Sequence, residues 1–157
     1  MKKRIISVFV SLLVVSIFAL PMSAVYATKP TYVEWDSVTG MYLATPVVDV
    51  VGENTIIITK TVKTWENGDI TGIGTTESRM IIHKDGHITT SAVTKITVTG
   101  FMGDAVVGTL VVKHGSIGLW RIISGTGDLA NLHGEGEVTS NSAPKTWTFK
   151  GQAHLDP

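Results

Sequence analysis

The alternation of apolar and polar positions from residue 54 onward is that of β-strands. Residues 55–65 are dense in β-branched side chains, which pack well on a pleated sheet. The run ends in an Asn67-Gly68 step, the dipeptide that a type I′ hairpin turn favours. We therefore predict a hairpin whose returning strand covers residues 70–83, with a bulge or bend at Gly72 and Gly74.

Residues 88–101 alternate more strictly. Successive side chains of a strand point to opposite faces, and one face of this segment carries most of the apolar residues. A further strand at 105–114 is apolar on both faces, so its sequence does not show which face points inward. The face of 88–101 that we expect to line the core consists of Ile88, Thr90, Ala92, Thr94, Ile96 and Val98.

The last predicted strand covers residues 145–155. Its inward face is expected to carry Trp147, Phe149, Gly151, Ala153 and Leu155. At the other end of the chain, residues 32–35 predict a short strand that stops at the turn residues Asp36-Ser37. Residues 41–51 predict an edge strand or two short pieces, because Pro46 cannot donate to a ladder.

Residues 124–139 hold four glycines and no proline. Glycine permits sharp backbone turns, so we interpret this stretch as a tight corner of a closed sheet, with a strand resuming at 134–139. After residue 27, no window of about twelve residues shows helical apolar spacing. About seven to nine short strands with short turns fit a barrel or a sandwich. Glycines inside strands favour the barrel, because they let a sheet bend enough to close.

The first 27 residues have the three-part pattern of a secretory signal peptide. Lys2, Lys3 and Arg4 precede an apolar run over residues 5–20, and small residues lead to a predicted cleavage after Ala27. The run is shorter than the ~20 residues that span a bilayer, although a retained anchor is the alternative. We predict a signal-peptide helix, a secreted or extracytoplasmic location, and one mature domain over 28–157, in which 28–53 precedes a barrel body at 54–157.

Charge and cysteine content limit the classes of function that the protein can have. Cleavage removes three of the 13 basic residues and no acidic one, so 10 Lys plus Arg face 13 Asp plus Glu. Without a basic surface, nucleic acid is not an expected partner. The chain has no cysteine, so its core must stabilise it without disulfides. We expect no cofactor and no membrane span after cleavage, while a homo-oligomer stays open.

The segment GTGDLANLHGEG, residues 125–136, resembles the strand-turn-strand signature of the allene oxide cyclase and dirigent type of barrel. Gly115-Ser116 ends a strand some ten residues earlier, and this order is most similar to an uncharacterised microbial family of that superfamily. The resemblance implies an eight-stranded antiparallel barrel with a central cavity. It does not carry over the cyclase activity, because no counterparts of that enzyme's cavity residues are found.

Three side chains near this segment could carry chemistry. His133, Glu135 and Glu137 lie two residues apart and share one side of a strand, at ~7 Å spacing. They form either an outward polar face or an acid-base pair, and two same-face ligands do not complete a metal site. Glu135 is the first catalytic candidate, because flanking glycines allow close approach. Glu77 is the second, and if it and Arg121 pointed inward they would have to pair.

Tryptophan side chains fill a barrel or line its cavity. The ligand-binding candidates are Trp120, Arg121, His133 and Trp147. Three functions stay open: a carrier of a small, mainly apolar molecule, an isomerase or cyclase that uses an inward Glu135 or Glu77, and a structural or assembly protein of dirigent type. A filled interior would exclude the first two, since both need a cavity.

Overall fold

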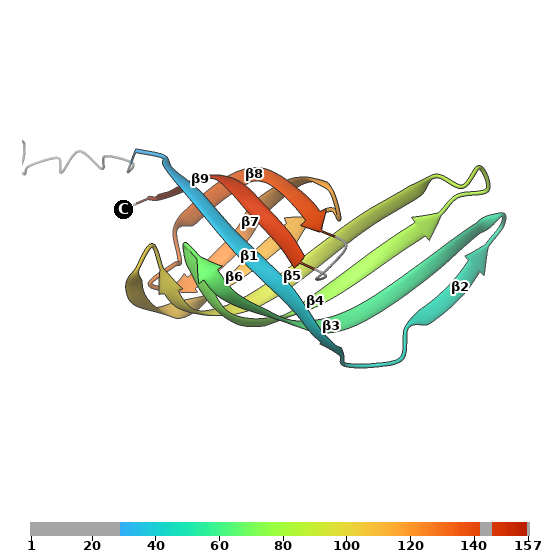
Figure 1. Ribbon diagram of the computed structural model, residues 1–157, viewed down its shortest axis with the longest axis horizontal. Coiled ribbons are helices and arrows are strands. Elements are labelled where there is room, and N and C mark those ends of the chain that lie inside the picture. The colour runs from blue at the N-terminus through green and yellow to red at the C-terminus, as the bar shows by residue number, and fades with distance from the viewer. Residues whose placement is uncertain (1–28, 142–145, 157) are drawn as a thin grey trace, which may run out of the picture.

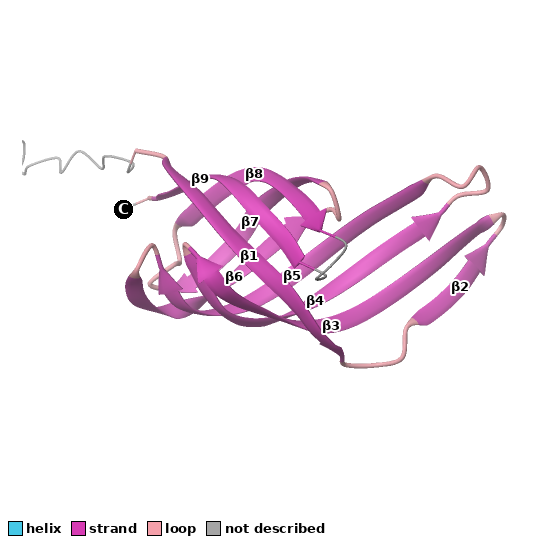
Figure 2. Ribbon diagram, in the orientation of Figure 1, coloured by secondary structure: helices cyan, strands magenta, loops and turns pink. Residues whose placement is uncertain are grey.

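The computed structural model describes residues 29–141 and 146–156. The predicted signal peptide, residues 1–27, lies outside them. The described residues form nine strands and no helix (Figure 2), so no helix among them is long and apolar enough to cross a membrane. The strands are β1 (Thr31–Tyr42), β2 (Val47–Val51), β3 (Asn54–Gly68), β4 (Ile70–Ile82), β5 (Ile88–Phe101), β6 (Asp104–His114), β7 (Gly118–Gly127), β8 (Leu132–Asn141) and β9 (Thr146–Leu155).

The strands close into an antiparallel barrel. Each strand from β3 to β9 pairs with the next, β9 pairs with β1, and β1 pairs with β3. Because β2 pairs with β3 alone, the closed ring consists of the other eight strands (Figure 1). The predicted eight-stranded barrel is confirmed.

The first strand is longer than its sequence predicts. Residues 36 and 37 do not end it, and β1 continues to Tyr42. Its pairing with β9 is continuous from Thr31 to Val38, whereas its register with β3 shifts between Asp36 and Val38. The turn-forming residues thus lie in a bulged strand, because β1 is held by ladders on both sides.

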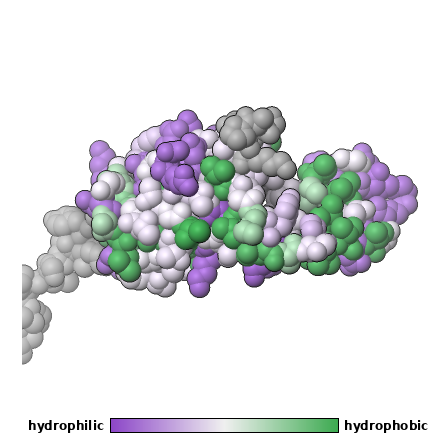
Figure 3. Space-filling model, turned by 60° about the horizontal axis from the view of Figure 1, so that its bottom comes forward, coloured by the Kyte–Doolittle hydropathy of each residue, from purple (hydrophilic) through white to green (hydrophobic). Residues whose placement is uncertain are grey.

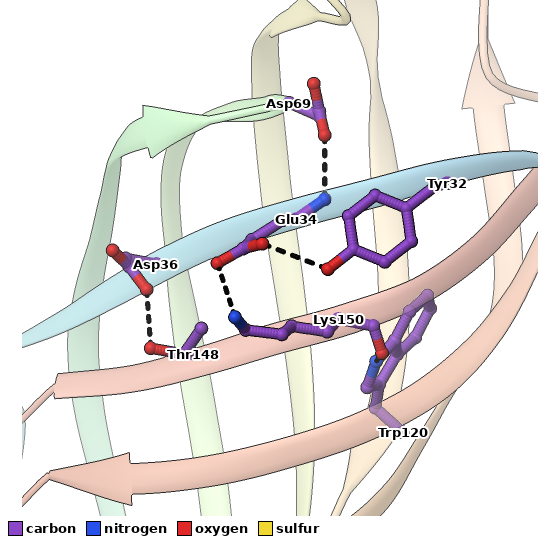
Figure 4. Close-up of polar contacts among 7 residues, drawn as sticks. All are labelled: Tyr32, Glu34, Asp36, Asp69, Trp120, Thr148 and Lys150. Carbon is purple, nitrogen blue, oxygen red and sulfur yellow. Dashed lines mark hydrogen bonds and ion pairs between the residues drawn. The ribbon is translucent and has the colours of Figure 1, made fainter.

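Polar contacts fasten β1 in place (Figure 4). Glu34 forms an ion pair with Lys150 of β9 at 2.9 Å, and its backbone N–H donates to the Asp69 carboxylate at 2.7 Å. Asp36 accepts a hydrogen bond from the Thr148 hydroxyl, also at 2.7 Å. These contacts join β1 to β9 and to the β3–β4 turn, where the barrel closes.

The glycine predictions are confirmed in part. The β3–β4 hairpin is present, but Asn67 has no positive φ and pairs with Asp36, so its turn is not type I′. The β4–β5 register shifts at Gly72, where an added Cβ would collide with the Thr97 carbonyl, but not at Gly74. In the glycine-rich stretch, β7 ends at Gly127 with a positive φ of 62°, and β8 begins at Leu132. A hydrogen bond joins this corner to β6, because the Asp128 carboxylate accepts it from the Val107 N–H at 2.8 Å.

The predicted inward face of β5 is buried within the barrel, but Ile88 is 53% exposed. The reason is that β3, β4 and β5 extend beyond the part of the barrel in which the ring of strands is closed. β6 pairs with β5 only from Ala92 onward, and β1 pairs with β3 only from Thr61 onward. The parts of β3, β4 and β5 beyond these points, together with β2, form a projecting sheet (Figure 1). We call it the extension: residues 47–51, 54–60, 77–82 and 88–91.

Candidate functional site

One part of the barrel interior is filled by aromatic side chains. The rings of Trp35 and Trp120 meet edge to face with centroids 4.6 Å apart, and Phe149 stacks on Trp35 at 5.3 Å. All three are buried, and the indole N–H of Trp120 donates to the Lys150 carbonyl at 3.0 Å. The central cavity implied by the resemblance is therefore occupied here, and Trp120 is a core residue.

Beside the aromatic cluster lies a buried chain of polar groups. The hydroxyls of Thr76 and Thr94 are 2.7 Å apart, and Thr94 lies 3.1 Å from His114 Nε2. His114 Nδ1 lies 2.7 Å from the Gly115 carbonyl. Because a carbonyl only accepts, Nδ1 of a neutral ring carries the proton, and Nε2 accepts from Thr94. Thr76 then donates to Thr94.

The neutral form of His114 is favoured by its surroundings. Burial lowers the pKa of its imidazole to about 4, and the positive charge of Lys63 lowers it further, against the opposing effect of the Gly115 carbonyl. His114 is thus an uncharged acceptor at neutral pH.

Lys63 is the most unusual residue of the interior. It is only 4% exposed, and its Nζ lies 4.0 Å from the ring centroid of Trp147. Among the described residues no carboxylate forms an ion pair with it. Burial lowers the pKa of its amine to about 8. At neutral pH the site therefore holds a buried ammonium, which the Trp147 ring stabilises only in part.

Other polar atoms near Lys63 lack partners as well. Within the described part of the chain, no hydrogen bond reaches Ser37 Oγ, Thr39 Oγ1 or Trp65 Nε1. Thr39 is the cross-strand neighbour of Lys63, and Ser37 is that of Trp147. Buried polar groups in proteins are nearly always hydrogen-bonded. We call this group, Ser37, Thr39, Lys63, Trp65 and Trp147, the polar end.

Beyond the polar end, the inner face first carries the hydroxyl side chains of Thr61, Thr76, Thr59 and Ser78 and then becomes apolar on the extension. The β3–β4 register is unbroken from Thr55 to Trp65, so alternate residues continue the inner face of the barrel onto the extension. Figure 3 shows hydrophobic side chains gathered at this end of the molecule. The residues that share the inner face there are Val48, Val50, Ile57, Met80, Ile82 and Ile88.

The predicted catalytic carboxylates lie elsewhere. Glu77 of the extension and Glu135 of the barrel are both exposed on the outer face of the sheet, so neither points at the interior. Arg121 is also exposed, and the inward pair of Glu77 and Arg121 does not form. The idea of an inward Glu acting on an enclosed substrate does not fit these positions.

The structure nevertheless brings several predicted residues together on the outside. Arg121 is the cross-strand neighbour of Glu135, and both line an open groove of about 730 Å³ that the predicted ligand-binding residue Trp120 and the buried His114 also line. A smaller groove of about 320 Å³ beside it also contains His133 and His154. These two imidazoles lie 3.4 and 3.6 Å from the Asp156 carboxylate. Within residues 29–141 and 146–156, no three side chains are arranged to hold a metal ion.

Of the predicted site residues, only Trp147 belongs to the polar end. Sequence reasoning missed Lys63, although a signal was present. In an unbroken strand, Thr61 and Lys63 share a face with Trp65, and a tryptophan usually points inward. The sequence could not show that Ser37 and Thr39 face Lys63, because this depends on how β1 pairs with β3.

No protein-family model matches the sequence, and no curated protein matches it significantly. Among solved structures, the pterocarpan synthase dirigent protein GePTS1 is similar at a TM-score of 0.51 and 11% identity, over 82% of this chain and 89% of that one. A second such protein, PsPTS1, has a TM-score of 0.46 and 14% identity, over 83% of this chain and 97% of that one. At such low identity the first likeness shows the fold alone, a dirigent-type barrel. The microbial family stays a prediction.

Proposed function

We propose that this protein binds a small, mainly apolar molecule that carries an anionic or hydrogen-bond-accepting group, and that this group lies at the polar end. The observation that carries the proposal is the buried ammonium of Lys63, which has no counter-charge among the described residues. A ligand anion would pair with Lys63, and its oxygens could accept hydrogen bonds from Ser37, Thr39 and Trp65.

The apolar part of the ligand would lie along the inner face of the extension. Ile57, Met80 and Ile82 continue the face that carries Lys63, and because Ile57 lies six residues from Lys63, a molecule that contacts both would extend about 20 Å along β3. Since one part of the interior is packed with aromatic rings, the polar end takes the place of the closed cavity expected from the sequence.

We also infer a dirigent-type role outside the cell. GePTS1, which shares the fold, is named as a pterocarpan synthase dirigent protein, and the sequence before the barrel has the pattern of a signal peptide. A shared fold does not transfer a substrate, so the ligand is specified only by the chemistry of the polar end. Export with cleavage after Ala27 predicts a mature protein whose intact mass corresponds to residues 28–157.

Binding of two fluorescent probes tests the proposal. 1-Anilinonaphthalene-8-sulfonate is apolar and anionic, and N-phenyl-1-naphthylamine is its neutral counterpart. Lys63→Met should weaken binding of the sulfonate about tenfold, the effect of losing ~1.4 kcal/mol, and should leave the neutral probe unaffected. Lys60→Met is the matched control, because Lys60 lies on the same strand but is exposed.

The pH dependence gives an independent readout. Raising the pH through about 8 deprotonates Lys63, so the affinity of the wild type for the sulfonate should fall, while that of Lys63→Met should not. Equal sulfonate affinity in the wild type and both variants at pH 7 would refute the proposed site.

A further inference from the structure

β2 leaves one edge of the extension unpaired. It is the last strand in the sheet order and pairs only with β3. Its sequence is Val-Val-Asp-Val-Val, and its four valines are 54–66% exposed. Natural proteins usually protect such edges with lysine, proline or a covering segment. Within β2 the one charge is Asp49, and no described segment covers the outer edge of the strand.

The edge is self-complementary. Val47–Val51 reads the same in both directions around Asp49, and a twofold axis opposes each residue of one copy to the symmetric residue of the other. Antiparallel pairing centred on Asp49 would place Val48 opposite the partner's Val50, and Val47 opposite the partner's Val51. Valine pairs directly across an antiparallel ladder stabilise it.

From this geometry we propose that β2 pairs antiparallel with β2 of a second copy of the chain, around a twofold axis at Asp49. The two extensions then form one continuous sheet, and the free N–H and C=O groups of both edges become hydrogen-bonded. Val48 and Val50 lie on the same inner face as Ile57, so pairing also joins the apolar inner faces of the two copies. A second copy fits this edge because its matching residues are supplied by the same five-residue sequence.

Asp49 limits the strength of this contact. At the centre of the ladder it faces the partner's Asp49, and like charges directly opposite destabilise a strand pair. The association is therefore weak and reversible, and removal of the charge strengthens it. Asp49→Asn should shift the monomer–dimer equilibrium toward the dimer in sedimentation velocity measurements.

A cross-link tests the register directly, because the chain has no cysteine. Asp49→Cys places two thiols on the twofold axis, at the Cα separation that a disulfide requires. Mild oxidation should make the disulfide-linked dimer the main species. Val107→Cys is the control, because Val107 is 80% exposed but lies on β6, and it should stay monomeric.

Adding Val48→Lys to the Asp49→Cys variant should abolish the cross-link, because it places lysine in the ladder. Two outcomes would overturn the proposal: cross-linking of Asp49→Cys no greater than that of Val107→Cys, or cross-linking that Val48→Lys does not change. Loss of small-probe binding at Lys63 would not bear on either outcome.

Discussion

At the scale of single residues, Lys63 is retained at a cost in stability. A buried charge without a partner destabilises the folded state. Burial accordingly lowers the pKa of Lys63 to about 8, which means that the folded protein binds the proton less tightly than the unfolded chain does. Residues that destabilise a fold are often those that function requires. A binding role would explain why an ammonium lies where methionine would pack better.

Replacing Lys63 by methionine should therefore stabilise the protein. We expect the free energy of unfolding at pH 7 to rise by about 1–3 kcal/mol, because the desolvation of the charge is removed. The check is urea denaturation, with the exposed Lys60→Met as the control that changes little. A loss of stability in Lys63→Met would show that the ammonium is well compensated in the fold.

The sign of the pH dependence supports the same test. The folded-state pKa of Lys63, about 8, lies below the ~10.4 of a free lysine. Between these values the unfolded state binds more protons, so stability rises with pH. Wild-type stability relative to Lys63→Met should increase from pH 8 to 10. A constant difference would contradict the lowered pKa.

His114 should contribute to acid unfolding. Its folded-state pKa of about 4 lies below the ~6.5 of a free histidine, so its stabilising effect is complete above pH 6.5 and is lost as the pH falls toward 4. The loss is on the order of 3 kcal/mol. His114→Gln should flatten the stability profile between pH 7 and 4 in urea denaturation. The exposed His87→Gln is the control and should keep the wild-type slope.

At the scale of elements, two glycines of β8 differ in how much space surrounds them. A Cβ on Gly136 would collide with the Lys150 carbonyl and lie 2.5 Å from Gly151 Cα. At Gly134 the nearest atoms, Gln152 O and Ile122 Cδ1, are 3.1 Å away. The two strands approach more closely at Gly136 than any side chain allows.

Gly136→Ala and Gly134→Ala form a matched pair of variants. Gly136→Ala should lower the free energy of unfolding by roughly 3 kcal/mol or more, through displaced backbone, whereas Gly134→Ala should cost about 1 kcal/mol or less. Thermal and urea unfolding of both variants measure the difference. Equal stability of the two variants would mean that the β8–β9 contact adjusts freely.

The sequence predicted elements whose signals are local. Alternation identified the buried face of β5, and Asn67-Gly68 identified the place of the β3–β4 hairpin but not its turn type. It ended β1 too early, because Asp36-Ser37 resembles a turn when the flanking ladders are unknown. The exposure of Ile88 was also not predictable, since it depends on where β6 stops pairing with β5.

At the scale of the whole molecule, the barrel interior has two parts. Trp35, Trp120 and Phe149 fill one, and the other meets the extension at Lys63 and Trp147. The likeness to a dirigent protein shows the barrel fold alone, so the two parts of the interior follow from this chain's own residues. The pairing of β1 with β3, which closes the barrel, places Thr39 opposite Lys63. No local sequence pattern could have predicted that Thr39 is the neighbour of Lys63.

The titration of the Lys63 amine is the most direct test of this account. Lysine labelled with ¹³C at Cε reports each amine by NMR, and Lys63→Met assigns the signal. We expect its midpoint near pH 8 and an upward shift when 1-anilinonaphthalene-8-sulfonate is bound, because an anion stabilises the ammonium. A midpoint above 10 that does not respond to the probe would contradict both the buried charge and the site built on it.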